Sequence, residues 1–229
     1  MQIFLDTADT QEVKRWLAQG IVDGVTTNPS ILFQAGVGDP AEGAASLCAL
    51  LGDRPLSLEV TSNDREEMLR QGRSYARWAS NVAVKIPVIT EEGESCLGVV
   101  HQLSSEGVRV NCTALLSFNQ GILAAKAGAT YISLFAGRIA DEGHDPAETI
   151  TRVRRWLDLW RHPAQIIVGS IRTVMDIQQA ALAGAHIITI PPAFLPKMVD
   201  HKYSRETVRQ FNRDAARALA QAARTAAAD

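Results

Sequence analysis

Lys85 is the residue whose position in this sequence most directly suggests chemistry. It stands within the apolar run Asn81–Val88, whose β-branched residues predict a buried strand of a parallel sheet. Burying an ammonium group without a partner is costly, so such a lysine tends to lose its proton. A neutral lysine amine attacks carbonyl carbons and forms Schiff bases. The alternative is an edge-strand lysine whose ammonium group reaches solvent.

Polar side chains also occur late in seven strand-like runs, where they alternate with apolar residues. They are Asp6, Thr26, Asn28, Glu59, Lys85, Asn111, Thr113, Ser133 and Ser170. Period-two alternation puts Asn111 and Thr113 on one face of their strand, and Phe135 on the same face as Ser133. Packing alone would put Val, Ile or Leu at such positions, so the set predicts an active site at the strand ends. Glu59 is the hardest to explain otherwise, because buried carboxylates without a function are rare.

The other members of this set each have a structural alternative. Asp6 could stabilise the start of the following helix, where acidic residues are favoured. Asn28 precedes a proline and could only shape the turn into a helix. Thr26, Thr113 and Ser133 could be strand formers or core residues whose hydroxyl groups are hydrogen-bonded internally.

Two arginines follow the sixth and seventh strand-like runs. Arg138 stands in Phe135–Arg138, and Arg172 comes two residues after Ser170. Two guanidinium groups beside a serine at the end of a strand suit a phosphate group, which arginine binds through two hydrogen bonds. Either arginine alone could instead form a solvated surface ion pair.

The elements that must position these residues follow from eight strand-like runs separated by helical stretches. The runs are Ile3–Leu5, Gly24–Thr27, Leu56–Val60, Val82–Ile86, Val108–Thr113, Tyr131–Leu134, Ile166–Val168 and Ile187–Ile190. Strands alternating with helices form a parallel sheet, and eight of them close into a (β/α)8 TIM barrel. The 229 residues are close to the roughly 250 of such barrels. We therefore expect a single α/β barrel domain over residues 1–229.

Local signals predict where several helices begin and end. Helix starts are indicated at Thr7–Asp9, at Thr61–Asp64 and at Thr90–Glu92, the last opening a helix through Leu103. Helix ends are indicated by Gly107, Gly128 and Gly184. Residues 141–146 are predicted to form a loop.

A C-terminal helix within residues 204–229 follows the eighth strand and a helical stretch at Ala193–Val199. Its apolar stripe consists of Val208, Phe211, Ala215, Leu219 and Ala222. Because the barrel is already complete at this point, the stripe needs another surface to cover it. We expect the helix to pack on a neighbouring subunit of a homo-oligomer.

Composition excludes several classes of protein. Hydrophobic residues make up 46% and charged residues 21% of the chain, as in an ordinary globular protein. The formal net charge is −2 without a basic block, which argues against nucleic-acid and membrane partners. No targeting or membrane-spanning segment stands out, so we expect a cytoplasmic protein.

Cysteines and histidines do not have the spacing of a metal site or a disulfide framework. The three cysteines are Cys48, Cys96 and Cys112, and the five histidines are scattered. Cys112 is interpreted as a small buried filler. We expect neither a metal nor another cofactor.

With these residues identified, the chain resembles the transaldolase family, in particular the short single-barrel branch that also includes fructose-6-phosphate aldolases. The matching segments are Phe4–Ala8, Gly24–Ser30, Val84–Pro87, Glu106–Thr113, Ala127–Ser133, Phe135–Ile139 and Ser170–Arg172. They occur in order along nearly the whole chain. The Thr-Thr-Asn-Pro-Ser run and the strand with Lys85 are the most specific of them.

This resemblance implies a role for each residue of the set. Lys85 would form a Schiff base with the C2 ketone of a ketose phosphate, and Asp6 would act as general acid and base. Glu59 and Thr113 would hold a water molecule that shuttles protons. The substrate-binding residues would be Thr26, Asn28, Asn111, Ser133 and Phe135, with Arg138, Ser170 and Arg172 at the phosphate group. The resemblance also implies a decamer of two pentamers.

Two positions favour transfer of a three-carbon dihydroxyacetone unit to an aldose phosphate. The aldolases of this branch typically have Gln at position 59 and Tyr at position 135, whereas this chain has Glu59 and Phe135. The expected donors are fructose 6-phosphate and sedoheptulose 7-phosphate. The family's usual proline at position 134 is Leu134 here, and its usual valine at 136 is Ala136.

Three alternatives remain to the transferase prediction. A lyase of the fructose-6-phosphate aldolase kind would use the same residues and release free dihydroxyacetone. A deoxyribose-phosphate aldolase would need a second active-site lysine, and the other lysines fall on predicted helices or loops. A non-catalytic sugar-phosphate-binding barrel would be expected to lack Lys85 or Asp6, and this chain has both.

Overall fold

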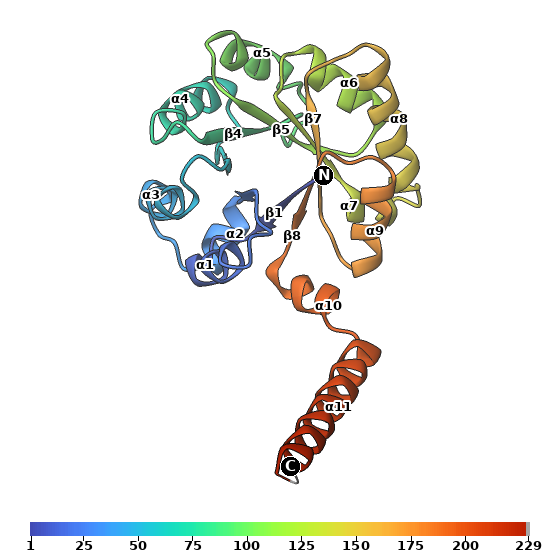
Figure 1. Ribbon diagram of the computed structural model, residues 1–229. Helices are drawn as coiled ribbons and strands as arrows, with labels where there is room; N and C mark the ends of the chain where they lie inside the picture. The colour runs from blue at the N-terminus through green and yellow to red at the C-terminus, as the bar shows by residue number, and fades with distance from the viewer. Residues whose placement is uncertain (228–229) are drawn as a thin grey trace. The chain divides into compact units, whose positions relative to one another are not determined.

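The computed structural model describes residues 1–227 and contains a closed parallel barrel. Its strands are β1 (Gln2–Asp6), β2 (Gly24–Thr26), β3 (Leu56–Glu59), β4 (Val82–Pro87), β5 (Val110–Leu115), β6 (Tyr131–Phe135), β7 (Gln165–Gly169) and β8 (Ile187–Ile190). Each strand pairs in parallel with the next, and β8 pairs with β1. In Figure 1 the helices between the strands surround the barrel. The predicted (β/α)8 fold is confirmed.

The helices between the strands begin mostly at side-chain caps. They are α1 (Thr10–Leu17), α2 (Pro29–Gln34), α3 (Pro40–Leu51), α4 (Arg65–Tyr75), α5 (Leu97–Ser105), α6 (Phe118–Lys126), α7 (Ala136–Asp141), α8 (Pro146–Leu159) and α9 (Val174–Leu182). Asp9 caps α1 and Asp64 caps α4, as the start signals predicted. The predicted loop at 141–146 is shorter, because α7 includes Asp141 and α8 begins at Pro146.

The helix start predicted at Thr90–Glu92 is wrong. Thr90 and Glu94 close a turn in which the Thr90 amide donates to the Glu94 carbonyl at 2.9 Å. Gly93 lies in this turn with a φ of +83°, which favours glycine. The chain therefore stays in a tight turn, and α5 begins only at Leu97.

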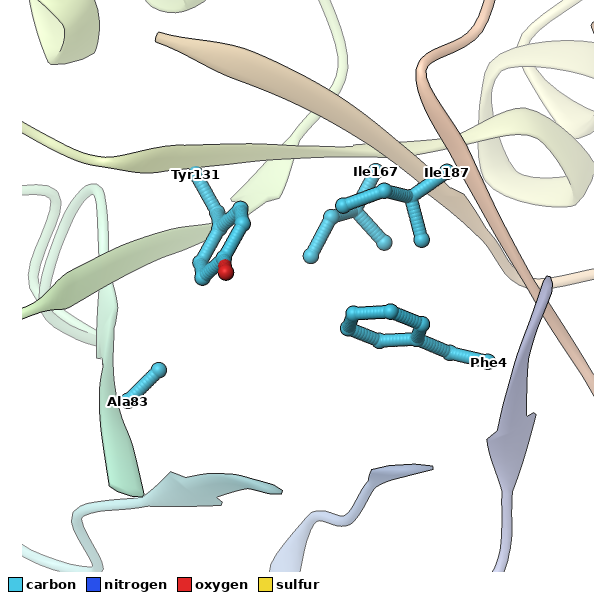
Figure 2. Packing of buried hydrophobic residues seen from close by; sticks show 5 residues of the cluster. All are labelled: Phe4, Ala83, Tyr131, Ile167 and Ile187. Atoms are coloured by element: carbon cyan, nitrogen blue, oxygen red, sulfur yellow. The ribbon is translucent and has the colours of Figure 1, made fainter. Parts of the chain in front are cut away.

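A layer of apolar side chains fills the barrel interior, as Figure 2 shows. Its members are Phe4, Ala83, Tyr131, Ile167 and Ile187. Gly24 makes room for this layer, since a Cβ there would lie 2.7 Å from the Phe4 ring. Because side chains alternate along a strand, the residues two positions further on point into the same interior, nearer the carboxyl ends of the strands. The apolar layer thus closes the barrel beneath those ends.

A second compact unit begins at Ala193, after the unit Met1–Pro192. It contains α10 (Leu195–Val199) and α11 (Lys202–Ala226). The C-terminal helix predicted within residues 204–229 is thus present as α11, while positions 228 and 229 lie outside the described residues. The assignment of residues 1–229 to a single domain stays a prediction. Among the described residues, no helix is both long and apolar enough to cross a membrane.

Candidate active site

Lys85 lies in the barrel interior with its ammonium group paired. Its Nζ is 2.9 Å from Glu59 Oε2 and donates a hydrogen bond to the Thr27 carbonyl at 2.8 Å. The residue is only 4% exposed. The parallel register of β3 and β4 places Glu59 beside Lys85. The buried amine of Lys85 thus has a carboxylate partner that can take its proton.

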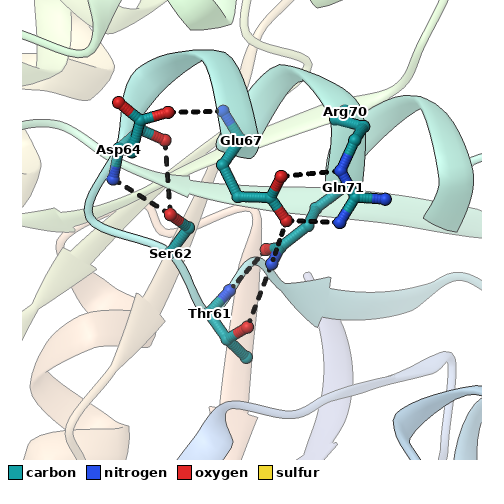
Figure 3. Close-up of polar contacts among 6 residues, drawn as sticks. All are labelled: Thr61, Ser62, Asp64, Glu67, Arg70 and Gln71. Atoms are coloured by element: carbon teal, nitrogen blue, oxygen red, sulfur yellow. Dashed lines mark hydrogen bonds and ion pairs between the residues drawn. The ribbon is translucent and has the colours of Figure 1, made fainter.

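The start of α4 fixes the backbone that follows Glu59. In Figure 3 the Thr61 amide donates to Gln71 Oε1 at 2.8 Å, and Gln71 Nε2 donates back to Thr61 Oγ1 at 3.2 Å. Asp64 caps the helix by accepting from the Glu67 amide at 2.8 Å. These bonds tie the segment after β3 to its helix and limit the freedom of Glu59.

A cavity of about 200 Å³ opens at the carboxyl ends of the strands. It is lined by Asp6, Thr26, Asn28, Lys85, Ser133, Phe135, Arg138, Ile167, Gly169, Ser170 and Thr189. Asp6, Lys85, Ser133, Gly169 and Thr189 each stand two residues after a member of the apolar interior layer. The structure therefore brings most of the predicted residues to one polar cavity. Ile167 of the apolar layer in Figure 2 also lines this cavity.

Asp6 combines burial with nearby charges. Burial raises the pKa of its carboxyl group, while the Lys85 ammonium and a hydrogen bond from Thr26 lower it and the Glu59 carboxylate raises it. Thr26 Oγ1 donates this bond to Asp6 Oδ1 at 2.7 Å. A carboxyl group whose pKa is moved toward neutrality is suited to give and take protons.

Side-chain amides hold other parts of the cavity wall. Ser133 Oγ donates to Asn111 Oδ1 at 2.7 Å, and Asn111 Nδ2 donates to Ser57 Oγ at 3.1 Å. Asn111 thus supports the wall from behind rather than lining it. Asn28 Oδ1 accepts from the Ile31 amide at 2.9 Å, which caps α2 and fixes the carboxamide at the cavity.

Thr113 lies fully buried on β5, next to Pro87 of β4. Its Oγ1 has no hydrogen-bond partner among residues 1–227. A buried hydroxyl group normally has a partner, so this one is suited to hold a water molecule. Thr113 does not belong to the residues that line the cavity.

The two predicted phosphate-binding arginines differ in their surroundings. Arg138 lines the cavity, and its Nη1 is 3.9 Å from Asp141 Oδ2. Arg172 instead forms a bidentate ion pair with Asp141 and lines a separate cavity among α7, α8 and α9. This pair and its hydrogen bonds hold the pKa of Asp141 below its ordinary value.

Arg172 and Ser170 nevertheless both lie close to Gly137, which has no side chain to separate them. A Cβ at this glycine would lie 2.7 Å from Arg172 Nε and 2.8 Å from Ser170 Oγ. Ser170 itself has a φ of +58°, a strained conformation for a residue other than glycine. The guanidinium group of Arg172 therefore lies near Ser170, which lines the cavity, although it pairs with Asp141.

Thr189 is the cavity residue that the sequence prediction missed, together with Ile167 and Gly169. It is the single polar residue of Ile187–Ile190 and is 5% exposed. Threonine is common in strands, so its presence there gave no distinct signal. No group of three or more possible metal ligands occurs in the described part of the chain.

Comparison with known proteins shows the family of this chain. A family model described as transaldolase/fructose-6-phosphate aldolase matches residues 3–229. A protein named "Probable transaldolase 2" from Listeria monocytogenes is 44% identical over 214 residues, covering 93% of this chain and 95% of its own. A "Probable transaldolase" from Streptococcus equi subsp. zooepidemicus is 42% identical, with 93% and 97% covered.

A solved structure shares the fold alone. It is a thiamine phosphate pyrophosphorylase from Pyrococcus furiosus, with a TM-score of 0.56 and 11% sequence identity. The match covers 82% of this chain and 85% of the other.

Proposed function

Because this chain belongs to the transaldolase/fructose-6-phosphate aldolase family, we propose that it is a transaldolase working through a Schiff base on Lys85. It transfers a dihydroxyacetone unit from a ketose phosphate, fructose 6-phosphate or sedoheptulose 7-phosphate, to an aldose phosphate. The observation that carries the proposal is the paired Lys85 amine beside Glu59 and Asp6, at one polar cavity on the barrel rim.

The first half of the reaction makes and breaks bonds at the ketose. Glu59 takes a proton from Lys85, and the free amine attacks C2 of the ketone. Loss of water from the carbinolamine leaves an iminium, which is an electron sink. Asp6 then removes the proton of the C4 hydroxyl group, the C3–C4 bond breaks, and the aldose phosphate product leaves. The three-carbon unit stays on Lys85 as an enamine.

The second half reverses these steps with another aldehyde. The enamine carbon attacks the acceptor carbonyl, and Asp6 returns a proton to the new alkoxide. Water then adds to the iminium and releases the new ketose phosphate and the Lys85 amine. We assign this water to Glu59 and Thr113, and the unpartnered Thr113 hydroxyl group supports the assignment. Asn28 and Ser133 orient the three-carbon unit, and Asn111 holds Ser133 in place.

Dependence on an acceptor tests the proposed function directly. Turnover of fructose 6-phosphate is expected to require an added aldose phosphate such as erythrose 4-phosphate. The enamine is held on Lys85 until an aldehyde arrives, since water can release the three-carbon unit only after the enamine carbon is protonated, and Phe135 brings no hydroxyl group to the cavity that could relay this proton. Product analysis with and without the acceptor measures this.

The same assay separates transfer from cleavage. Phe135→Tyr is expected to raise release of free dihydroxyacetone by about tenfold relative to transfer, because a phenol can relay a proton to the enamine carbon. Phe135→Leu, which adds no hydroxyl group, is the matched control. If the native chain cleaves fructose 6-phosphate rapidly without acceptor, it is a lyase of the fructose-6-phosphate aldolase kind. A chain that binds sugar phosphates without turnover would be a non-catalytic barrel.

Arg138, Ser170 and Arg172 are proposed to bind the substrate phosphate. Arg172 must then exchange part of its ion pair with Asp141 for the phosphate group. Replacing either arginine with alanine is expected to raise KM for fructose 6-phosphate about tenfold or more, since a charged hydrogen bond is lost. Arg152→Ala is the matched control, because Arg152 forms an exposed pair with Glu148 on α8. An unchanged KM in both active-site variants would make them surface arginines.

The chain is also proposed to be a homo-oligomer, with α11 covering a neighbouring copy. Val208, Phe211 and Leu219 of α11 are 56%, 66% and 73% exposed. Such an apolar stripe gains free energy when another surface covers it. The resemblance favours a decamer of two pentamers. Light scattering at micromolar concentration is expected to give a mass well above the 24.8 kDa of one chain, and a sharp monomer mass would contradict this.

A further inference from the structure

Three hydroxyl and carboxyl oxygens from neighbouring strands form a continuous chain in the cavity wall. Thr26 Oγ1 of β2 lies 2.7 Å from Asp6 Oδ1 of β1 and 2.5 Å from Thr189 Oγ1 of β8. Both threonines are almost fully buried, at 2% and 5% exposure. All three residues line the cavity. Thr26 is therefore the centre of a hydrogen-bonded chain rather than only a wall residue.

The number of available protons fixes the direction of these two hydrogen bonds. An ionised carboxylate only accepts hydrogen bonds, and each hydroxyl group has one proton to donate. Thr26 must therefore donate its hydrogen bond to Asp6 when Asp6 is ionised. Its oxygen can then only accept from Thr189, so the Thr189 proton points to Thr26. The two bonds run from Thr189 through Thr26 to Asp6.

We propose that Thr189 is a positioning residue for the reaction, which donates a hydrogen bond to the Thr26 hydroxyl group, strengthens the bond from Thr26 to Asp6 and thereby stabilises the ionised form of Asp6. This inference rests on the proposed role of Asp6 as the general base. Without the Thr189 hydroxyl group, the Thr26 oxygen loses the hydrogen bond that it accepts. Hydrogen bonds in a chain polarise one another, so the bond to Asp6 also weakens.

The other charges that face Asp6 are few and stay in place when Thr189 changes. They are Lys85 on β4 and Glu59 on β3, with Arg138 on the same cavity. The strands that pair with β1, namely β2 and β8, contain no titratable side chain. The Thr26 hydrogen bond lowers the pKa of Asp6, so weakening it leaves that pKa higher.

The pH dependence of transfer tests the inference. In Thr189→Val, which keeps the shape and removes the hydroxyl group, kcat is expected to fall by about three- to tenfold. The acidic limb of its pH profile is expected to move upward by about half a pH unit or more, because a less stable carboxylate needs a higher pH to ionise. Thr189→Ser keeps the hydroxyl group and is expected to restore the native limb.

Two controls separate this inference from its alternatives. In an Asp6→Asn background, Thr189→Val is expected to have no further effect on kcat, since Thr189 acts through Asp6. The positioning role would be overturned if the acidic limb of the pH profile stayed at its native position in Thr189→Val. It would also be overturned if activity fell equally at all pH values and Thr189→Ser did not restore it. Failure of the native chain to catalyse transfer at all would instead contradict the proposed function. Thermal unfolding of each variant checks that the barrel is intact.

Discussion

Replacing Lys85 with methionine is expected to lower kcat/KM for dihydroxyacetone transfer by at least about four orders of magnitude, because no other group can form the Schiff base. Methionine has a similar length and suits a buried site. It leaves the Glu59 carboxylate without its partner, however, which costs folding free energy. The double variant Lys85→Met, Glu59→Gln removes this unpaired charge. It therefore shows whether loss of activity comes from loss of the amine or from unfolding.

Borohydride trapping identifies the reacting amine independently of turnover. Reduction in the presence of fructose 6-phosphate is expected to attach a three-carbon unit to the peptide that contains Lys85. The remaining lysines, Lys14, Lys126, Lys197 and Lys202, are exposed and serve as internal controls. Labelling at one of these, or equal labelling in Lys85→Met, would refute the assignment.

The sequence predicted those features that depend on periodicity and chain order. Parallel strands end at one rim, so polar residues late in successive runs had to meet there once the barrel closed. Asp6, Lys85 and Ser133 line the cavity for this reason. The helix starts at Asp9 and Asp64 were predicted correctly because a capping side chain bonds to the first turn of the helix that follows it in the sequence.

The features that the sequence did not predict depend on contacts between distant residues. The partner of Lys85 follows from the register of β3 and β4, which the sequence does not specify. The pairing of Arg172 with Asp141 depends on the rotamers that two exposed side chains adopt at the surface. At Thr90 the sequence is compatible with both a helix cap and a turn through Gly93, and the structure has the turn. Thr189 was missed because its role comes from hydrogen bonding to Thr26 on another strand.

Asp6→Asn is expected to stop the reaction one step later than Lys85→Met. Asparagine has the same shape and can still accept the Thr26 hydrogen bond, but it cannot take up a proton. The amine of Lys85 and its partner Glu59 are unchanged, so the Schiff base still forms. Transfer is expected to fall by about two to four orders of magnitude. Trapping with borohydride should then yield the whole six-carbon ketose phosphate on Lys85, because the C3–C4 bond stays intact.

The pKa of Asp6 adds a second and independent expectation for the same variant. Burial raises this pKa in the folded protein, so the folded state binds the proton more tightly than the unfolded chain does. Ionising Asp6 therefore reduces stability as the pH rises from the ordinary pKa of an aspartate through the raised one. Asp6→Asn avoids this loss, and its Tm at neutral pH is expected to equal or exceed that of the native chain. A three-carbon adduct formed at the native rate would mean that another group breaks the bond. A lower Tm would mean that the Asp6 carboxyl group stabilises the fold.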